Sequence, residues 1–208
     1  MLEEILKNKL VPVAVINDVK QAVPLAEALL AADLNVIEVT LRTDAAMDCM
    51  EAIKRSAPDM IVGAGTLLDH NLVPRLVDMG ISFAITPGIN PKVIENAQKH
   101  NLLIMPGVIT PSEIELARNF DLDVLKFFPA EAAGGAAMLN AFSGPYGHTG
   151  IRFIPTGGIN LANMLDYIKI PCVAAVGGSW FVASKLMQEN KYDEITRLTS
   201  EALSLIQN

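Results

Sequence analysis

Short apolar runs alternate with longer amphipathic segments along the chain. The apolar runs are rich in Val and Ile, and eight of them have the length of strands: residues 10–16, 35–40, 60–66, 83–88, 103–108, 123–129, 152–158 and 173–179. Such continuous runs are typical of parallel strands that are buried on both faces. Helical patterns lie between them, for example over residues 19–33, 44–57, 91–100 and 111–120. The pattern predicts eight strand–helix units.

Eight such units indicate the α/β fold class and, within it, a single (β/α)8 TIM barrel with an extra N-terminal helix. We expect one barrel domain over residues 1–208, with a closing helix at residues 192–207. Several strand runs end in Gly, Pro or Thr just before the next helix, which is the signal of short loops. An open, doubly wound sheet is the alternative, but it more often shows fewer strands and a longer nucleotide-binding first loop.

The composition narrows the class of partner. The chain has 208 residues, a formal net charge of −7 and no run of Lys or Arg, which argues against nucleic acid or an anionic membrane as partner and favours a small molecule. Cys49 and Cys172 have neither disulfide-framework nor zinc-site spacing. No apolar run approaches the roughly 20 residues of a membrane-spanning helix, and the charged N-terminus does not resemble a secretory signal. We expect a soluble, cytoplasmic protein.

Polar side chains alternate with apolar ones in the second predicted strand. Glu38, Thr40 and Arg42 share one side of this strand if the alternation of an extended chain holds. A buried carboxylate and guanidinium are costly unless they are paired or used. A purely structural Glu–Arg pair is the alternative to a functional site.

A lysine lies within the sixth predicted strand, among apolar residues. Burial of Lys126 disfavours its charged ammonium, and a nearby cation such as Arg42 has the same effect, so a free amine becomes available to attack a carbonyl carbon. The alternative is an ammonium that extends out of the barrel or neutralises a carboxylate.

Glycines and turn residues follow several strands. Thr66 ends a Gly-rich run after the third strand, and Pro87 belongs to a Pro-Gly turn after the fourth, which we interpret as pocket wall only. Gly-Gly pairs close the seventh and eighth strands, where many barrels bind phosphate through backbone N–H groups and a following helix N-terminus. Simple tight turns are the alternative reading of both pairs.

Seven motifs, in order and spacing, make the chain resemble the 2-keto-3-deoxy-6-phosphogluconate (KDPG) aldolase / 4-hydroxy-2-oxoglutarate (KHG) aldolase family over essentially its whole length. The motifs are IEVTLRT (37–43), GAGT (63–66), TPG (86–88), PGVITPSE (106–113), LKFFPAE (125–131), PTGGI (155–159) and VGGSW (176–180).

The resemblance implies a role for each candidate residue. Lys126 is expected to form the Schiff base and Glu38 to move protons as the general acid and base. The remaining candidates are expected to hold the substrate carboxylate (Arg42, Thr66, Thr156), to line the pocket (Pro87, Phe128) and to bind phosphate (Gly157, Gly158, Gly178, Ser179).

The resemblance also implies the reaction, namely class I aldol cleavage of 2-dehydro-3-deoxy-6-phosphogluconate to pyruvate and glyceraldehyde 3-phosphate. Members of the family also cleave 4-hydroxy-2-oxoglutarate to pyruvate and glyoxylate, similar proteins are homotrimers, and no metal or other cofactor is required. A galactonate-derived epimer is an alternative substrate. Another phosphate-binding barrel enzyme, such as an isomerase or epimerase, and a binding protein without turnover are the alternative functions.

Overall fold

The computed structural model describes residues 1–207 and contains a strand in each of the eight predicted runs. The fifth run, residues 103–108, contains two short strands separated by Pro106, a residue that has no N–H for a sheet hydrogen bond. The strands are β1 (Leu10–Ala14), β2 (Val36–Thr40), β3 (Ile61–Gly65), β4 (Phe83–Ile85), β5 (Leu103–Met105), β6 (Gly107–Val108), β7 (Val124–Phe127), β8 (Arg152–Pro155) and β9 (Val176–Gly178).

Helices follow the strands, and an additional helix precedes the first strand, as predicted. They are α1 (Leu2–Leu6), α2 (Ala22–Leu30), α3 (Ala46–Ser56), α4 (Val73–Asp78), α5 (Pro91–Lys99), α6 (Pro111–Arg118), α7 (Gly135–Tyr146), α8 (Met164–Ile168), α9 (Ser184–Gln188) and α10 (Tyr192–Gln207). In the described residues, four short 3₁₀ helices supplement them: η1 (Val19–Gln21), η2 (His70–Leu72), η3 (Gly147–Thr149) and η4 (Trp180–Val182). The predicted segment 19–33 divides into η1 and α2 because the first turn is 3₁₀.

The strands form a curled parallel sheet in two hydrogen-bonded sections. Six strands pair in the order β5-β4-β3-β2-β1-β9, and three pair in the order β6-β7-β8. Two isolated parallel bridges connect these sections: Phe153 of β8 pairs with Val173, which precedes β9, and Thr156, just after β8, pairs with Gly177 of β9. The fold is therefore α/β with a curled parallel sheet, and the ladder is interrupted at Pro106 and between β8 and β9.

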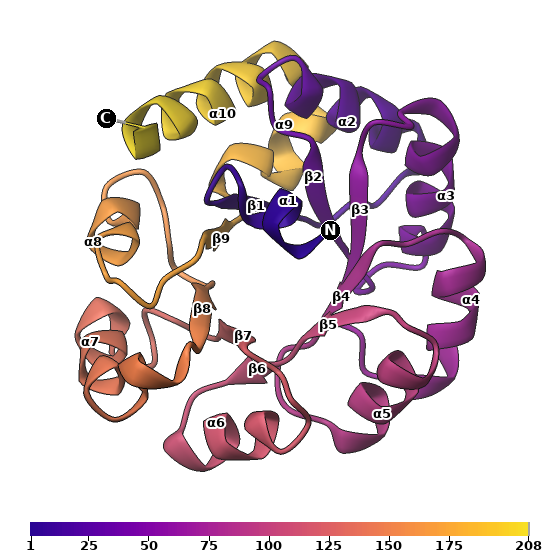
Figure 1. Cartoon of the computed structure of the whole chain (residues 1–208). Helices are drawn as coiled ribbons and strands as arrows, with labels where there is room; N and C mark the ends of the chain where they lie inside the picture. Colours follow the sequence, from indigo (N-terminus) through magenta and orange to yellow (C-terminus); the bar gives the residue numbers. More distant parts are fainter. Residues whose placement is uncertain (208) are drawn as a thin grey trace.

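Figure 1 shows the strands around the centre of the molecule and the helices α2 to α8 outside them. The register sets Glu38 beside Val13 on β1 and beside Gly63 on β3. In the second section, Lys126 lies beside Gly107 and Ile154. Parallel strands bring their carboxyl ends to one edge, so the loops that follow β2, β3, β4, β7 and β8 meet there.

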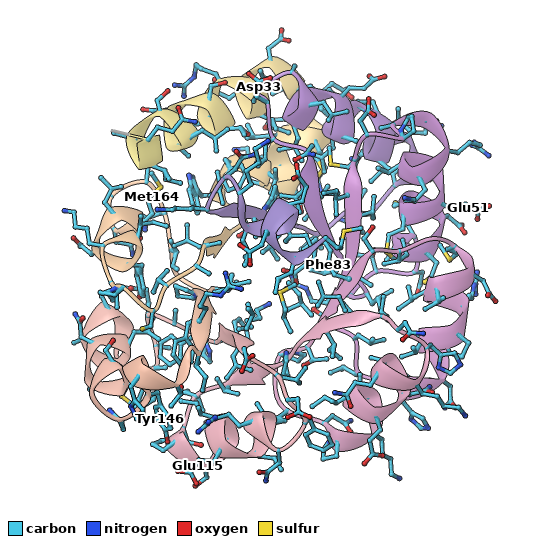
Figure 2. The ribbon with its side chains drawn as sticks, in the orientation of Figure 1. Asp33, Glu51, Phe83, Glu115, Tyr146 and Met164 are labelled. Atoms are coloured by element: carbon cyan, nitrogen blue, oxygen red, sulfur yellow. The ribbon has the colours of Figure 1, made fainter. Side chains whose placement is uncertain are left out.

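Buried side chains form a single hydrophobic cluster that extends from Ile5 on α1 to Leu203 on α10. Figure 2 shows Phe83 toward the middle of the molecule and Glu51 on the outer side of α3, which illustrates the division between the two faces of the elements. Within residues 1–207, few polar side chains are buried, and among them Glu38 is the one carboxylate and Lys126 the one amine. Across residues 1–207, no helix is long and apolar enough to cross a membrane.

Candidate active site

A cavity of about 250 Å³ opens at the carboxyl ends of the strands. Its size is close to the lower limit of about 300 Å³ for typical ligand pockets, which suits a small keto acid. Its walls come from five of the loops or strand ends and from β1, and the lining residues are Val13, Glu38, Thr40, Arg42, Thr66, Pro87, Lys126, Phe128 and Thr156. All seven residues that the sequence assigned to catalysis, carboxylate binding and the pocket wall are thus brought together.

Lys126 and Glu38 form a buried ion pair within this cavity. The Nζ atom of Lys126 lies 3.4 Å from Oε1 of Glu38, and the side chains are 6% and 1% exposed. Such burial is costly for two separated charges, but a proton transfer from the ammonium to the carboxylate neutralises both groups at once. The pair can therefore supply a neutral amine and a carboxylic acid next to each other.

Glycines in β3 make room for Glu38. A side chain at Gly65 would collide with the carboxyl group of Glu38, and one at Gly63 would collide with the ring of Phe83. The Gly-x-Gly spacing is therefore explained by close approach of neighbouring side chains to the strand. It leaves the Glu38 carboxylate free to reach toward Lys126.

Arg42 lies at the mouth of the cavity, beyond the end of β2. Its Nε donates to Oγ1 of Thr40 at 3.4 Å, and Thr40 in turn donates to the carbonyl of Ala14 at 3.1 Å. The guanidinium is exposed, so its remaining donors can meet a carboxylate in the fork geometry that arginine favours.

Thr66 and Thr156 face the same cavity from the ends of β3 and β8. Thr66 has a φ of 56°, a left-handed conformation that is uncommon for a residue with a branched Cβ. Backbone outliers of this kind gather at ligand sites. The hydroxyl of Thr156 contacts the carbonyl of Ile154 at 3.4 Å.

Phe128 places an aromatic face near the lysine. The Nζ atom of Lys126 is 5.0 Å from the centroid of the Phe128 ring, within the range of a cation–π interaction. This arrangement favours a positive charge at the nitrogen, whether the group is an ammonium or an iminium.

The two Gly-Gly pairs lie outside the cavity lining. Gly157 and Gly158 have φ values of 100° and 80°, so both positions require glycine. Gly178 is buried against the ring of Trp180, whereas Ser179 is exposed. The first pair follows the end of β8, the second pair forms the end of β9, and the bridge between Thr156 and Gly177 brings them close in space.

Hydrogen bonds fix the orientation of the loop after β8. The carbonyls of residues 156–158 accept bonds from Ala130 N–H at 2.8 Å, Glu131 N–H at 3.1 Å and the Asn163 amide at 3.2 Å. In a trans peptide, the next N–H points opposite to the carbonyl. The N–H groups of residues 157–159 are therefore directed away from these donors and are not turned into the contacts with Ala130, Glu131 and Asn163.

Sequence reasoning gave no role to Val13 and Thr40, which also line the cavity. The alternation along the second strand did place Thr40 on the same side as Glu38, but no role was assigned to it. Val13 carries no chemical signal, and only its register beside Glu38 reveals its position. Within the described part of the chain, no group of three or more His, Cys, Asp or Glu side chains could hold a metal ion.

Comparison with known proteins gives a consistent result. The family model for KDPG and KHG aldolase matches residues 2–198. The 2-dehydro-3-deoxy-phosphogluconate aldolase of Haemophilus influenzae is 41% identical over 206 residues, which cover 99% of this chain and 96% of that protein. The KHG/KDPG aldolase of Escherichia coli is 42% identical over 193 residues, which cover 93% and 90%.

A solved structure of KDPG aldolase from Legionella pneumophila, with pyruvate captured at low pH as a covalent carbinolamine intermediate, superposes with a TM-score of 0.89. It is 39% identical, and the match covers 93% of each chain. With the family model matched over nearly the whole chain and relatives above 40% identity, the protein belongs to the KDPG and KHG aldolase family.

Proposed function

We propose that this protein is a class I aldolase that cleaves 2-dehydro-3-deoxy-6-phosphogluconate to pyruvate and glyceraldehyde 3-phosphate. The observation that carries the proposal is the buried lysine whose Nζ lies 3.4 Å from the carboxylate of Glu38, in a cavity that also presents Arg42. A lysine that can lose its proton to a neighbouring carboxylate is the requirement for attack on a ketone. An isomerase or epimerase is not favoured, because the chain belongs to an aldolase family.

Lys126 is the proposed nucleophile. Its neutral amine attacks C2 of the keto acid, the carbonyl oxygen takes up a proton, and loss of water gives an iminium. The iminium accepts the electron pair of the C3–C4 bond as the C4 hydroxyl loses its proton, and the aldehyde leaves. The remaining enamine is protonated at C3, and water releases pyruvate and restores the amine.

Glu38 is the proposed general acid and base for these steps. It lies close enough to Lys126 to receive the ammonium proton and to return a proton to the carbinolamine oxygen. The neighbouring ring of Phe128 supports the positive iminium, and Pro87 completes the pocket wall.

The substrate carboxylate is proposed to bind to Arg42, Thr66 and Thr156. All three line the cavity together with Lys126, and a guanidinium with two hydroxyl donors suits a carboxylate. Binding at this end orients C2 toward the amine, which is the positioning that an intramolecular attack requires.

The substrate phosphate is proposed to bind to Gly157, Gly158, Gly178 and Ser179. The orientation of the 157–159 N–H groups supports this assignment, as does the exposure of Ser179 at the neighbouring strand end. The ring of Trp180 occupies the space beside Gly178, so no side chain fits at position 178 and Gly178 would bind phosphate through its backbone. We also propose activity on 4-hydroxy-2-oxoglutarate, which uses the same cavity without a phosphate; the galactonate-derived epimer is an alternative phosphorylated substrate.

Three broader features belong to the same proposal. One hydrophobic cluster among the described residues supports a single domain. Closure as a (β/α)8 barrel is supported at the two breaks in the sheet: β5 and β6 are separated only by Pro106, and two isolated bridges connect β8 and Thr156 with Val173 and Gly177. Family membership supports a homotrimer in the cytoplasm, with Entner–Doudoroff metabolism as the context. The iminium serves as electron sink, so the proposed reaction uses no cofactor.

A coupled assay tests this function. Purified protein is incubated with 2-dehydro-3-deoxy-6-phosphogluconate, and pyruvate is followed through its reduction by NADH and lactate dehydrogenase. We expect turnover that does not change after dialysis against a chelator. No pyruvate release, or a product that is an isomer of the substrate, would contradict the proposal.

A further inference from the structure

Glu131, the last residue of the LKFFPAE motif, has no part in the reaction described above, yet it is packed against the proposed phosphate loop. Its N–H donates to the carbonyl of Gly157 at 3.1 Å. Its Cβ and Cγ occupy the space beside Gly158, where each would lie 2.6 Å from an added Cβ. Both the backbone and the side chain of Glu131 therefore define the shape of the loop.

The carboxylate of Glu131 has a dedicated partner. Tyr167 on α8 is almost fully buried, and its hydroxyl donates to Oε1 of Glu131. Burial, followed by the hydrogen bond to Glu131, raises the pKa of Tyr167 above its ordinary value, so the hydroxyl remains a donor at neutral pH. The bond connects α8 with the turn after β7, and Gly158 lies against that turn.

The position of this carboxylate matters because an anion is expected beside it. A carboxylate that could turn toward the loop would repel a phosphate, and the effect is strong at short range. The hydrogen bond from the Tyr167 hydroxyl holds the Glu131 carboxylate toward α8. The same bond keeps Cβ and Cγ of Glu131 against Gly158.

We propose that Glu131 and Tyr167 are positioning residues whose hydrogen bond keeps the Gly157–Gly158 loop in the conformation that binds the phosphate of the substrate. The inference rests on the proposed phosphate site and adds two residues that select for phosphorylated substrates. Neither residue lines the cavity around Lys126, so both would act on binding of the distal end of the substrate.

The first test is Tyr167→Phe, which removes only the hydroxyl. Loss of one hydrogen bond to a charged group corresponds to roughly a 10- to 100-fold effect, and we expect a rise of about 10-fold or more in KM for 2-dehydro-3-deoxy-6-phosphogluconate. Two readouts that involve no phosphate should stay within about two-fold. They are kcat/KM for 4-hydroxy-2-oxoglutarate and the rate at which pyruvate and borohydride modify Lys126.

Two further variants separate positioning from a loss of stability. Glu131→Gln keeps Cβ, Cγ and an oxygen acceptor for the Tyr167 hydroxyl, so its KM should be close to that of the original protein. Tyr146→Phe is the matched control, because Tyr146 is also buried and also donates to a glutamate, Glu115, at 3.3 Å. Figure 2 shows Tyr146 at α7 and Glu115 at α6, in the lower part of the view. Tyr146→Phe should leave the ratio of the two substrates unchanged.

A charge placed at Ser179 tests the phosphate site independently of the pair. Ser179→Asp should raise KM for the phosphorylated substrate far more than Ser179→Asn, since only the first adds a negative charge. If this holds but Tyr167→Phe changes neither substrate, or both equally, the positioning role is wrong and the phosphate site stands. If Asp and Asn at position 179 behave alike on both substrates, the phosphate site itself is wrong and the inference fails with it.

Discussion

At the scale of single residues, the site depends on the absence of a side chain at Gly65 as well as on the charged groups of Glu38 and Lys126. Gly65 has an ordinary φ, so alanine is acceptable to its backbone, but a Cβ there would collide with the Glu38 carboxyl group. We predict that Gly65→Ala displaces Glu38 and lowers kcat about 100-fold or more, the scale of a lost general acid or base. Steady-state kinetics measures the effect. Gly147→Ala is the control, because a Cβ at 147 meets nothing, and its kcat should be unchanged.

Glu38 itself should be more important for turnover than for the first covalent step. Glu38→Gln retains the shape and a hydrogen-bond acceptor for Lys126 but cannot exchange protons. We predict a fall in kcat of about 100- to 10,000-fold, with some iminium formation from pyruvate still detectable after borohydride reduction. A variant with normal kcat would show that another group transfers the protons.

Cys49 provides a test of the core that is independent of the site. Burial raises the pKa of its thiol from 9.0 to about 11, so the folded protein holds this proton more tightly than the unfolded chain. The contribution of the thiol to stability is complete below pH 9 and is lost as pH rises toward 11. We predict no iodoacetamide labelling of Cys49 at pH 8 unless urea unfolds the protein. Peptide mass spectrometry detects the label, and rapid modification without urea would contradict the buried position.

At the scale of elements, five helices end in the same way. A residue with positive φ follows each of them: Asp33, Gly80, Asn101, Asp121 and Asn190. The next residue then donates back into the last turn, as in the bonds Leu34 N–H to Leu29 O and Leu102 N–H to Ala97 O. This is the Schellman pattern, which stops a helix and turns the chain toward the next element.

Two glycines with open space around them isolate the contribution of this backbone conformation. Gly80 has a φ of 71°, and a Cβ there would meet only the flexible end of Lys54 at 3.6 Å. Gly147, at the end of α7, has a right-handed φ of −59° and would meet nothing. Gly80→Ala should lower the free energy of unfolding by about 1 kcal/mol, whereas Gly147→Ala should raise it by about 0.5–1 kcal/mol. Urea titration of both variants measures their free energies of unfolding. Equal changes in the two variants would contradict the prediction that the positive φ at Gly80 sets the difference.

The strand pattern could be predicted from the sequence because continuous Val- and Ile-rich runs between helical segments are typical of buried parallel strands. The prediction did not include the break at Pro106, although proline lacks the N–H that a ladder needs. It also gave no residue range for α7, whose sequence GAAMLNAFSGPY begins with glycine and contains Pro145. Local propensity opposes such a helix, and packing of Leu139 and Phe142 into the core stabilises it.

At the scale of the whole molecule, the site combines residues from strands that are distant in sequence. Glu38 comes from β2 and Lys126 from β7, and a sequence pattern alone gives no distance between them. The prediction that they meet depended on the expected convergence of strand ends and on the family resemblance. The structure adds the pairing of these two side chains, the glycine that admits Glu38 and the contact between Glu131 and Gly158.

The most direct test of the account is to trap the proposed Schiff base. The protein is incubated with pyruvate and sodium borohydride, and intact and peptide mass spectrometry locate any adduct, with a reaction without pyruvate and the Lys126→Ala variant as controls. We predict a single pyruvate-derived adduct on Lys126, which is absent from both controls. An unmodified protein, or an adduct on another lysine that persists in Lys126→Ala, would contradict the assignment of Lys126 as the nucleophile.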